Sequence, residues 1–88
     1  MTINREDLKK KIIYRSTYRG SKEMDTLLSS FTKKYINTFN YKELIFLSDL
    51  LDFDDVSLYK FHHNEKINID IKLNKVTELF KNFIYKNN

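Results

Sequence analysis

Residues 18–23 bring together side chains that are suited to binding another molecule. Arg19 offers a planar fork of N–H donors, Glu23 offers a carboxylate, and Gly20 lets another backbone approach closely. Arginine and tyrosine, here Arg19 and Tyr18, are over-represented among residues that dominate binding energies. In a competing structural interpretation, Gly20 ends one helix, Ser21 begins the next and Arg19 pairs with Glu23 across the junction. The residues alone favour this structural interpretation, although a surface ion pair contributes at most about 1 kcal/mol to stability.

The sequence lacks the residues that catalysis or metal binding would need. The chain has no cysteine, and His62 and His63 are neighbours that would point about 100° apart on a helix. They therefore do not converge on one metal ion, and no carboxylate stands at the spacing of a zinc site. A group of aspartates lacks the spacing, glycine and terminal glutamate of a calcium loop: Asp49, Asp52, Asp54 and Asp55. Helix capping accounts for Asp54 and Asp55, and we expect no metal, no catalytic residue and no enzyme.

The composition is that of a small globular protein. Its 88 residues are 41% hydrophobic and 32% charged, which suffices for one core and argues against disorder. The absence of cysteine excludes a disulfide-stapled secreted scaffold and fits a reducing compartment. The basic run at residues 9–11 is followed only by the apolar pair Ile12-Ile13, so we expect no signal peptide and no membrane insertion. Because Glu6 and Asp7 fit a mitochondrial presequence poorly, we expect a cytoplasmic bacterial protein.

The formal net charge of the chain is +4, and a basic balance raises the prospect of a nucleic-acid partner. Most of the excess comes from lysines that are spread along the sequence rather than gathered in one stretch. We interpret these lysines as solvated surface, and we expect no nucleic acid among the partners.

Hydrophobic periodicity predicts an all-α fold, with five helices in a single domain over residues 1–88. The first helix is expected over about residues 4–18, with Gly20 closing it in the left-handed conformation. Ser21 is expected to cap a second helix. Its apolar residues recur at helical spacing: Met24, Leu27, Leu28, Phe31 and Tyr35. A third helix is expected to begin at a capping box over residues 40–43 and to reach Leu51.

The last third of the chain predicts two more helices. A short fourth helix is expected from Val56 to about His63. The fifth is expected from apolar residues at alternating spacings of four and three: Ile69, Leu73, Val76, Phe80 and Phe83. Residues 67–71 alternate as in a strand, but a lone strand has no partner, so we expect a helix start or an extended lead-in there. The five helices are expected to form a compact bundle.

Two blocks of the sequence resemble a known family, the succinate dehydrogenase flavinylation factors. The first block runs from Lys11 to Phe31 and contains the family's Arg-Gly-x-x-Glu motif at residues 19, 20 and 23, followed by the aspartate that Asp25 matches. The second block is Leu50-Leu51-Asp52-Phe53-Asp54-Asp55-Val56-Ser57-Leu58-Tyr59. The resemblance covers about residues 5–65 in the family's order and spacing, and the two blocks together are fairly specific.

The resemblance implies a five-helix bundle that works as an assembly factor. Such factors bind the flavoprotein subunit of succinate dehydrogenase, sometimes also that of fumarate reductase, and promote covalent attachment of FAD to a histidine of that subunit. The FAD belongs to the partner, so the resemblance implies no tightly held cofactor in this chain. The factor would favour a host conformation in which histidine and flavin are aligned.

The resemblance also implies a partner-binding site of six residues: Arg15, Tyr18, Arg19, Gly20, Glu23 and Asp25. Arg19 and Glu23 would supply charge-assisted contacts, and Gly20 would permit close backbone approach. Asp25 would either contact the partner or hold the motif through Arg15, and the sequence leaves both open.

A second function stays open at this stage. Some bacterial relatives carry an antitoxin label, so an alternative is an antitoxin-like regulator that neutralises a protein toxin. In either role we expect the chain to be a monomer.

Overall fold

Five α-helices and no strand are present in residues 4–17, 19–67 and 70–84, the parts of the chain that the computed structural model describes. The helices are α1 (Arg5–Thr17), α2 (Lys22–Tyr35), α3 (Tyr41–Leu50), α4 (Asp55–His62) and α5 (Lys75–Lys81). The radius of gyration is 12.5 Å, close to the value of about 12 Å for a compact chain of this length. The prediction of a compact all-α bundle of five helices is therefore confirmed. The assignment of residues 1–88 to one domain stays a prediction.

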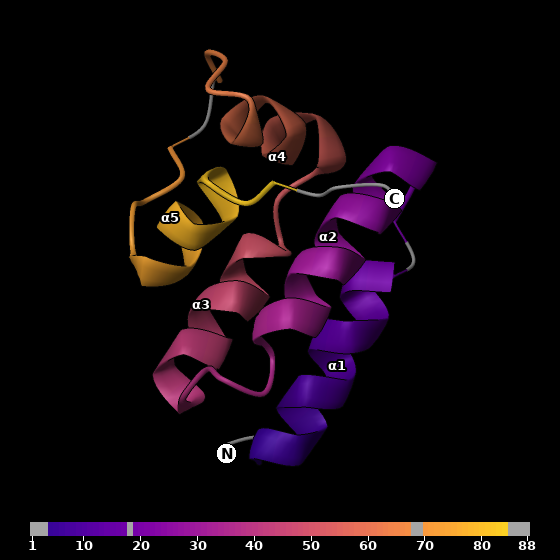
Figure 1. Cartoon of the computed structure of the whole chain (residues 1–88), viewed down its shortest axis with the longest axis vertical. Helices are drawn as coiled ribbons and strands as arrows, with labels where there is room; N and C mark the ends of the chain where they lie inside the picture. Colours follow the sequence, from indigo (N-terminus) through magenta and orange to yellow (C-terminus); the bar gives the residue numbers. More distant parts are fainter. Residues whose placement is uncertain (1–3, 18, 68–69, 85–88) are drawn as a thin grey trace.

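The first three helices run up, down and up, and the two short helices close one side of this group (Figure 1). α1 packs against α2 and α3, while α5 packs against α3 and α4. The side chains at the centre come from all five helices: Leu8, Ile12, Leu28, Phe31, Leu44, Leu47, Leu58, Val76 and Phe80. The ring of Phe31 lies 5.4 Å from those of Phe80 and Phe83, so aromatic contacts join α2 to the C-terminal part of the core.

The caps of α2 and α3 follow the sequence prediction. Ser21 has extended backbone angles, and its hydroxyl accepts a hydrogen bond from the Met24 N–H. Asn40 and Glu43 form a reciprocal capping box, in which each side chain accepts from the backbone N–H of the other residue. These caps satisfy helix N–H groups locally, which is why spacing alone identified both starts.

Glu43 also joins α3 to α5. Its side chain is only 11% exposed, and its Oε2 lies 2.7 Å from the Lys75 Nζ. The hydrogen bond from Lys75 lowers the pKa of the Glu43 carboxyl, and the hydrogen bond from the Asn40 N–H lowers it further. The capping glutamate of one helix is therefore also the electrostatic partner of another.

The predicted fifth helix begins too early. α5 starts at Lys75, because Asn74 caps it with extended backbone angles and forms a capping box with Thr77. Leu73 lies outside the helix and is 62% exposed, and Phe83 follows the helix end. Residues 70–74 have no regular secondary structure and lead into the helix, so the alternative of a helix start is not realised there, whereas residues 68 and 69 lie outside the described parts.

α4 ends in a motif that the sequence analysis did not predict. Asn64 has a φ of 58°, the left-handed region, and the Glu65 N–H donates to the Lys60 carbonyl at 2.8 Å while the Asn64 N–H donates to the Phe61 carbonyl at 3.2 Å. This pair of bonds is the Schellman arrangement, which usually employs glycine. Here an asparagine takes that position, since its short polar side chain tolerates the left-handed conformation.

Candidate functional site

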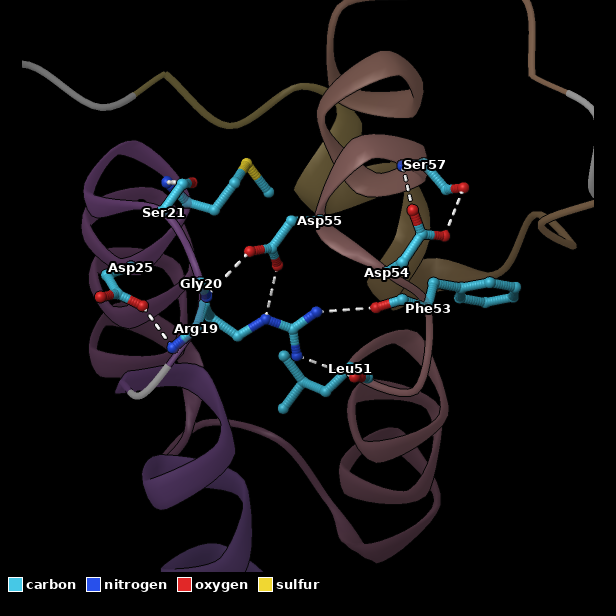
Figure 2. Close-up of polar contacts among 10 residues, drawn as sticks. Arg19, Gly20, Ser21, Asp25, Leu51, Phe53, Asp54, Asp55 and Ser57 are labelled. Carbon is cyan, nitrogen blue, oxygen red and sulfur yellow. Dashed lines mark hydrogen bonds and ion pairs between the residues drawn. The ribbon is translucent and has the colours of Figure 1, made fainter.

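The Arg19 side chain lies against the connection between α3 and α4 rather than in solvent (Figure 2). Its Nε donates to Asp55 Oδ1 at 2.8 Å, its Nη1 to the Leu51 carbonyl at 2.9 Å and its Nη2 to the Phe53 carbonyl at 2.7 Å. The side chain is only 12% exposed. Arg19 thus pairs with Asp55, 36 residues away, and not with Glu23 as the structural interpretation of the junction assumed.

Asp55 holds two groups of the motif at once. While its Oδ1 accepts from Arg19, its Oδ2 accepts from the Gly20 backbone N–H at 3.1 Å. Figure 2 shows both bonds converging on this carboxylate, which belongs to the first residue of α4. The sequence analysis assigned Asp55 to helix capping. That assignment is wrong, because Asp54 is the N-cap of α4 and Asp55 binds the motif.

Asp54 performs the capping role through Ser57. Its carboxylate accepts hydrogen bonds from the Ser57 hydroxyl at 2.6 Å and from the Ser57 N–H at 3.3 Å. These bonds, the hydroxyl first, hold the pKa of the Asp54 carboxyl below its ordinary value. The two neighbouring aspartates therefore have separate tasks, one for the helix and one for the motif.

Asp25 supports the junction from α2. Its Oδ1 accepts a hydrogen bond from the backbone N–H of Arg19. Arg15, the intermediary in one of the two alternatives left open for Asp25, lies elsewhere: its guanidinium contacts Asp52 and donates to the Ser48 carbonyl and hydroxyl in α3. Asp25 thus holds the motif directly, and Arg15 joins the end of α1 to the end of α3.

Gly20 is not in the left-handed conformation that the sequence analysis assigned to it. Among the residues that the structure describes, no glycine has a positive φ. A Cβ added at Gly20 would meet only Asp55 Oδ2, at 3.6 Å, which is ordinary van der Waals contact. α1 already ends at Thr17, and Gly20 lies exposed in the bend before α2. Neither backbone strain nor crowding therefore explains a glycine at this position.

Glu23 is exposed in the first turn of α2 and lies between two depressions of the surface. The first, which we call the motif hollow, has a volume of about 260 Å³. Its walls come from α2 and α4 and from residues just before α2 and just after α4: Ser21, Glu23, Met24, Asp55, Val56, Tyr59, Lys60 and Glu65. The second, the wide cleft, has a volume of about 610 Å³ and extends from Glu23 past Leu27 to His62 and Phe83. Tyr18, the remaining predicted residue, lies outside the described parts of the chain.

The two histidines lie at the end of α4, as predicted. His62 Nε2 is 2.6 Å from the Phe83 carbonyl, and His63 Nδ1 is 2.9 Å from the Tyr59 carbonyl. In the described part of the chain, no group of three or more histidine, cysteine, aspartate or glutamate side chains is arranged to hold a metal ion. Over the same residues, no helix combines the length and the apolar character needed to cross a membrane.

The partners of Arg19 were missed because they are distant in the sequence. Asp55 and the carbonyls of Leu51 and Phe53 are 32 to 36 residues from Arg19. One signal was available: the oppositely charged pairs Arg15/Arg19 and Asp52/Asp55 have internal spacings of four and three residues. Opposite charge favours a contact between the two pairs, but it does not identify which arginine meets which aspartate.

Together, the fold and the junction define a small all-α protein that carries a compact polar motif on an exposed bend. A family model described as "Flavinator of succinate dehydrogenase" matches residues 10–84. Because this match covers most of the chain, the protein belongs to the family of succinate dehydrogenase flavinators.

Individual relatives agree with this assignment. The chain is 35% identical over 75 residues to the FAD assembly factor SdhE of Wigglesworthia glossinidia brevipalpis, covering 82% of this chain and 86% of that protein. It is 47% identical over 49 residues to the mitochondrial succinate dehydrogenase assembly factor 2 of Scheffersomyces stipitis, covering 56% of this chain and 33% of the yeast protein. The chain thus spans about a third of the yeast relative's length. No solved structure matches the chain.

Proposed function

We propose that this chain is an assembly factor that binds the flavoprotein subunit of succinate dehydrogenase and promotes the covalent attachment of FAD to it. The observation that carries the proposal is the family match over residues 10–84, which includes the Arg-Gly-x-x-Glu motif and the aspartates that hold it. The bacterial relative is named for FAD assembly, and the yeast relative for assembly of succinate dehydrogenase. All these names describe assembly factors, and none supports the antitoxin alternative.

The proposed mechanism is conformational and not catalytic. The chain would bind the flavoprotein subunit in a conformation that aligns FAD with the side chain that receives it, and so shift the host's population toward that state. The bond-forming chemistry stays with the flavin and its host, so this chain needs no catalytic residue and no cofactor of its own. We place this action in the bacterial cytoplasm, in keeping with the bacterial relative.

The partner surface is proposed to be the exposed part of the junction. Gly20 and Glu23 are both exposed, and Glu23 lines both the motif hollow and the wide cleft. A carboxylate at this edge is suited to a cationic or N–H-donating group of the partner. Arg19, Asp25 and Arg15 support the surface from within, through the hydrogen bonds described above.

A co-expression experiment tests the function. The flavoprotein subunit is produced in an expression strain that lacks its own assembly factor, with and without this chain. Covalent flavin is then measured as fluorescence of the subunit in denaturing gels. We expect strong fluorescence only when the chain is present. We also expect the subunit to bind to the tagged chain. Equal fluorescence with and without the chain, at equal subunit levels, would refute the proposal.

A further inference from the structure

The Arg19 guanidinium has few donors left for another molecule. Three of its five N–H groups already donate to acceptors of this chain, one to Asp55 and two to backbone carbonyls of residues 51 and 53. With 12% of its side chain exposed, Arg19 is sheltered where a contact residue would be open. An arginine in this state acts on a partner mainly through what it holds in place.

Arg19 and Asp55 hold together the two walls of the motif hollow. One wall is the start of α2, which follows directly after Arg19 and Gly20 and carries Glu23. The other wall is the first turns of α4, which begin at Asp55 and carry Val56, a valine with 62% of its surface exposed. Asp55 binds the Arg19 side chain and the Gly20 backbone at the same time, so it joins the walls directly.

We propose that Asp55 is a positioning residue for partner recognition, and that the motif arginine, Arg19, acts through Asp55 rather than by touching the partner. This inference rests on the proposed function, because it concerns the same surface. Asp55 sets the distance between Glu23 on α2 and Val56 on α4, and the partner contacts both walls of the motif hollow at the same time. A carboxylate is needed because it must accept from a guanidinium N–H and a backbone N–H simultaneously.

A double-mutant cycle tests whether Arg19 and Asp55 act as one unit. Affinity for the purified flavoprotein subunit is measured for the full chain and for Arg19→Gln, Asp55→Asn and the double variant, well below the unfolding temperature of the least stable. Each single change is expected to weaken binding about tenfold. The double change is expected to weaken binding no more than the more damaging of the two single changes. Losses that multiply in the double variant would overturn the proposal, as would an Asp55→Asn variant that binds like the parent chain.

Asp54→Asn is the matched control. It removes the same charge one residue earlier, and asparagine remains a good N-cap for α4. We expect it to keep the parent affinity. If Asp54→Asn weakens binding as much as Asp55→Asn, net charge and not positioning is responsible, and the inference fails.

Arg19→Lys separates charge from positioning. Lysine keeps the positive charge but cannot donate to Asp55 and two carbonyls from one planar group. We expect Arg19→Lys to lose affinity about as strongly as Arg19→Gln. Retained affinity in Arg19→Lys would instead show that the partner senses the charge itself, and would overturn the proposal.

The single glycine of the chain supplies a readout that is independent of partner binding. A chain labelled with 15N-glycine gives one amide signal, that of Gly20, whose proton is hydrogen-bonded to Asp55 Oδ2. Asp55→Asn and Arg19→Gln should both move this signal, while Asp54→Asn should leave it in place. A signal that ignores Arg19→Gln would refute the coupling. If the parent chain fails to bind the subunit, the proposed function fails, whereas this signal still tests the Arg19–Asp55 link.

Discussion

The Asp25 carboxylate accepts a hydrogen bond from the Arg19 backbone N–H, so the first turn of α2 holds the bend that leads into it. The next N–H along the chain, that of Gly20, is held by Asp55 from α4. Two successive backbone donors are thus satisfied by carboxylates from two different helices. Arg19 and Gly20 belong to no helix themselves, so these two carboxylates fix the path of the backbone at the motif.

Replacing Asp25 should lower the free energy of unfolding, because the Arg19 N–H loses its hydrogen-bond acceptor. Asp25→Ala leaves the part-buried Arg19 N–H without its partner, and we expect a loss of about 1 kcal/mol, or a melting temperature lower by roughly 4–8 °C. Asp25→Asn keeps a carbonyl oxygen in the same place and should lose less. Thermal unfolding followed by circular dichroism measures both. An Asp25→Ala variant that melts with the parent chain would contradict the supporting role.

Gly20 should be replaceable for folding, whereas partner binding should tolerate only a small side chain at this position. The φ of Gly20 is not positive, and an added Cβ meets only Asp55 Oδ2, at 3.6 Å. The free energy of unfolding of Gly20→Ala should therefore lie within about 0.5 kcal/mol of that of the parent chain. Gly20→Arg should also fold, since the bend is exposed, but its long side chain covers the surface and competes with Arg19 for Asp55. We expect covalent flavin in the co-expressed subunit to survive Gly20→Ala and to be lost in Gly20→Arg. Loss of folding in Gly20→Ala would show that the position is needed for the fold itself.

Local signals in the sequence predicted the parts of the fold that depend on neighbouring residues. The starts of α2 and α3 were predicted because Ser21 and Asn40 bond to N–H groups within the next turn. The start of α5 was placed too early because the hydrophobic spacing was extended back to residues before Asn74, the N-cap at which the helix begins. Leu73 therefore appears on a helix face in the pattern and in solvent in the structure.

The candidate site was predictable in position but not in mechanism. The motif located the exposed bend, yet nothing local indicates that Arg19 turns inward to Asp55. A contact over 36 residues depends on how α4 packs, which single-residue patterns do not encode. The left-handed conformation was also assigned to the wrong residue, Gly20 instead of Asn64. Glycine often adopts this conformation, but a glycine does not require it.

Acid should destabilise the fold through Glu43 and Asp54. Both carboxyls have a pKa lowered in the folded chain, Glu43 first by the hydrogen bond from Lys75 and Asp54 first by that from the Ser57 hydroxyl. A carboxyl with a lowered folded pKa stabilises the fold above its unfolded pKa, about 4, and this contribution is lost as the pH falls through the folded value. We expect the melting temperature to decrease as the pH falls below about 4. Glu43→Gln should melt earlier at neutral pH and lose less on acidification, and a parallel pH dependence in both chains would contradict this assignment.

Glu23 should matter for binding while contributing little to the fold. Its carboxylate is exposed in the first turn of α2, where interaction with the helix dipole contributes about 0.3–1 kcal/mol. Glu78 is also exposed in the first turn of its helix, α5, so Glu78→Gln is a matched control for the same charge in the same kind of position. Both variants should therefore unfold at similar temperatures.

Affinity for the flavoprotein subunit should separate the two glutamates. Glu23 lines both the motif hollow and the wide cleft, so a cationic or N–H group of the partner that reaches this edge loses its acceptor in Glu23→Gln. We expect about tenfold weaker binding for Glu23→Gln, a larger loss for Glu23→Lys, and the parent affinity for Glu78→Gln. Added salt should weaken the parent complex more than the Glu23→Gln complex, because only the parent has this ion pair to screen. Equal affinities and equal salt slopes for Glu23→Gln and Glu78→Gln would show that the motif glutamate does not touch the partner, and the contact surface would then have to be sought along α4.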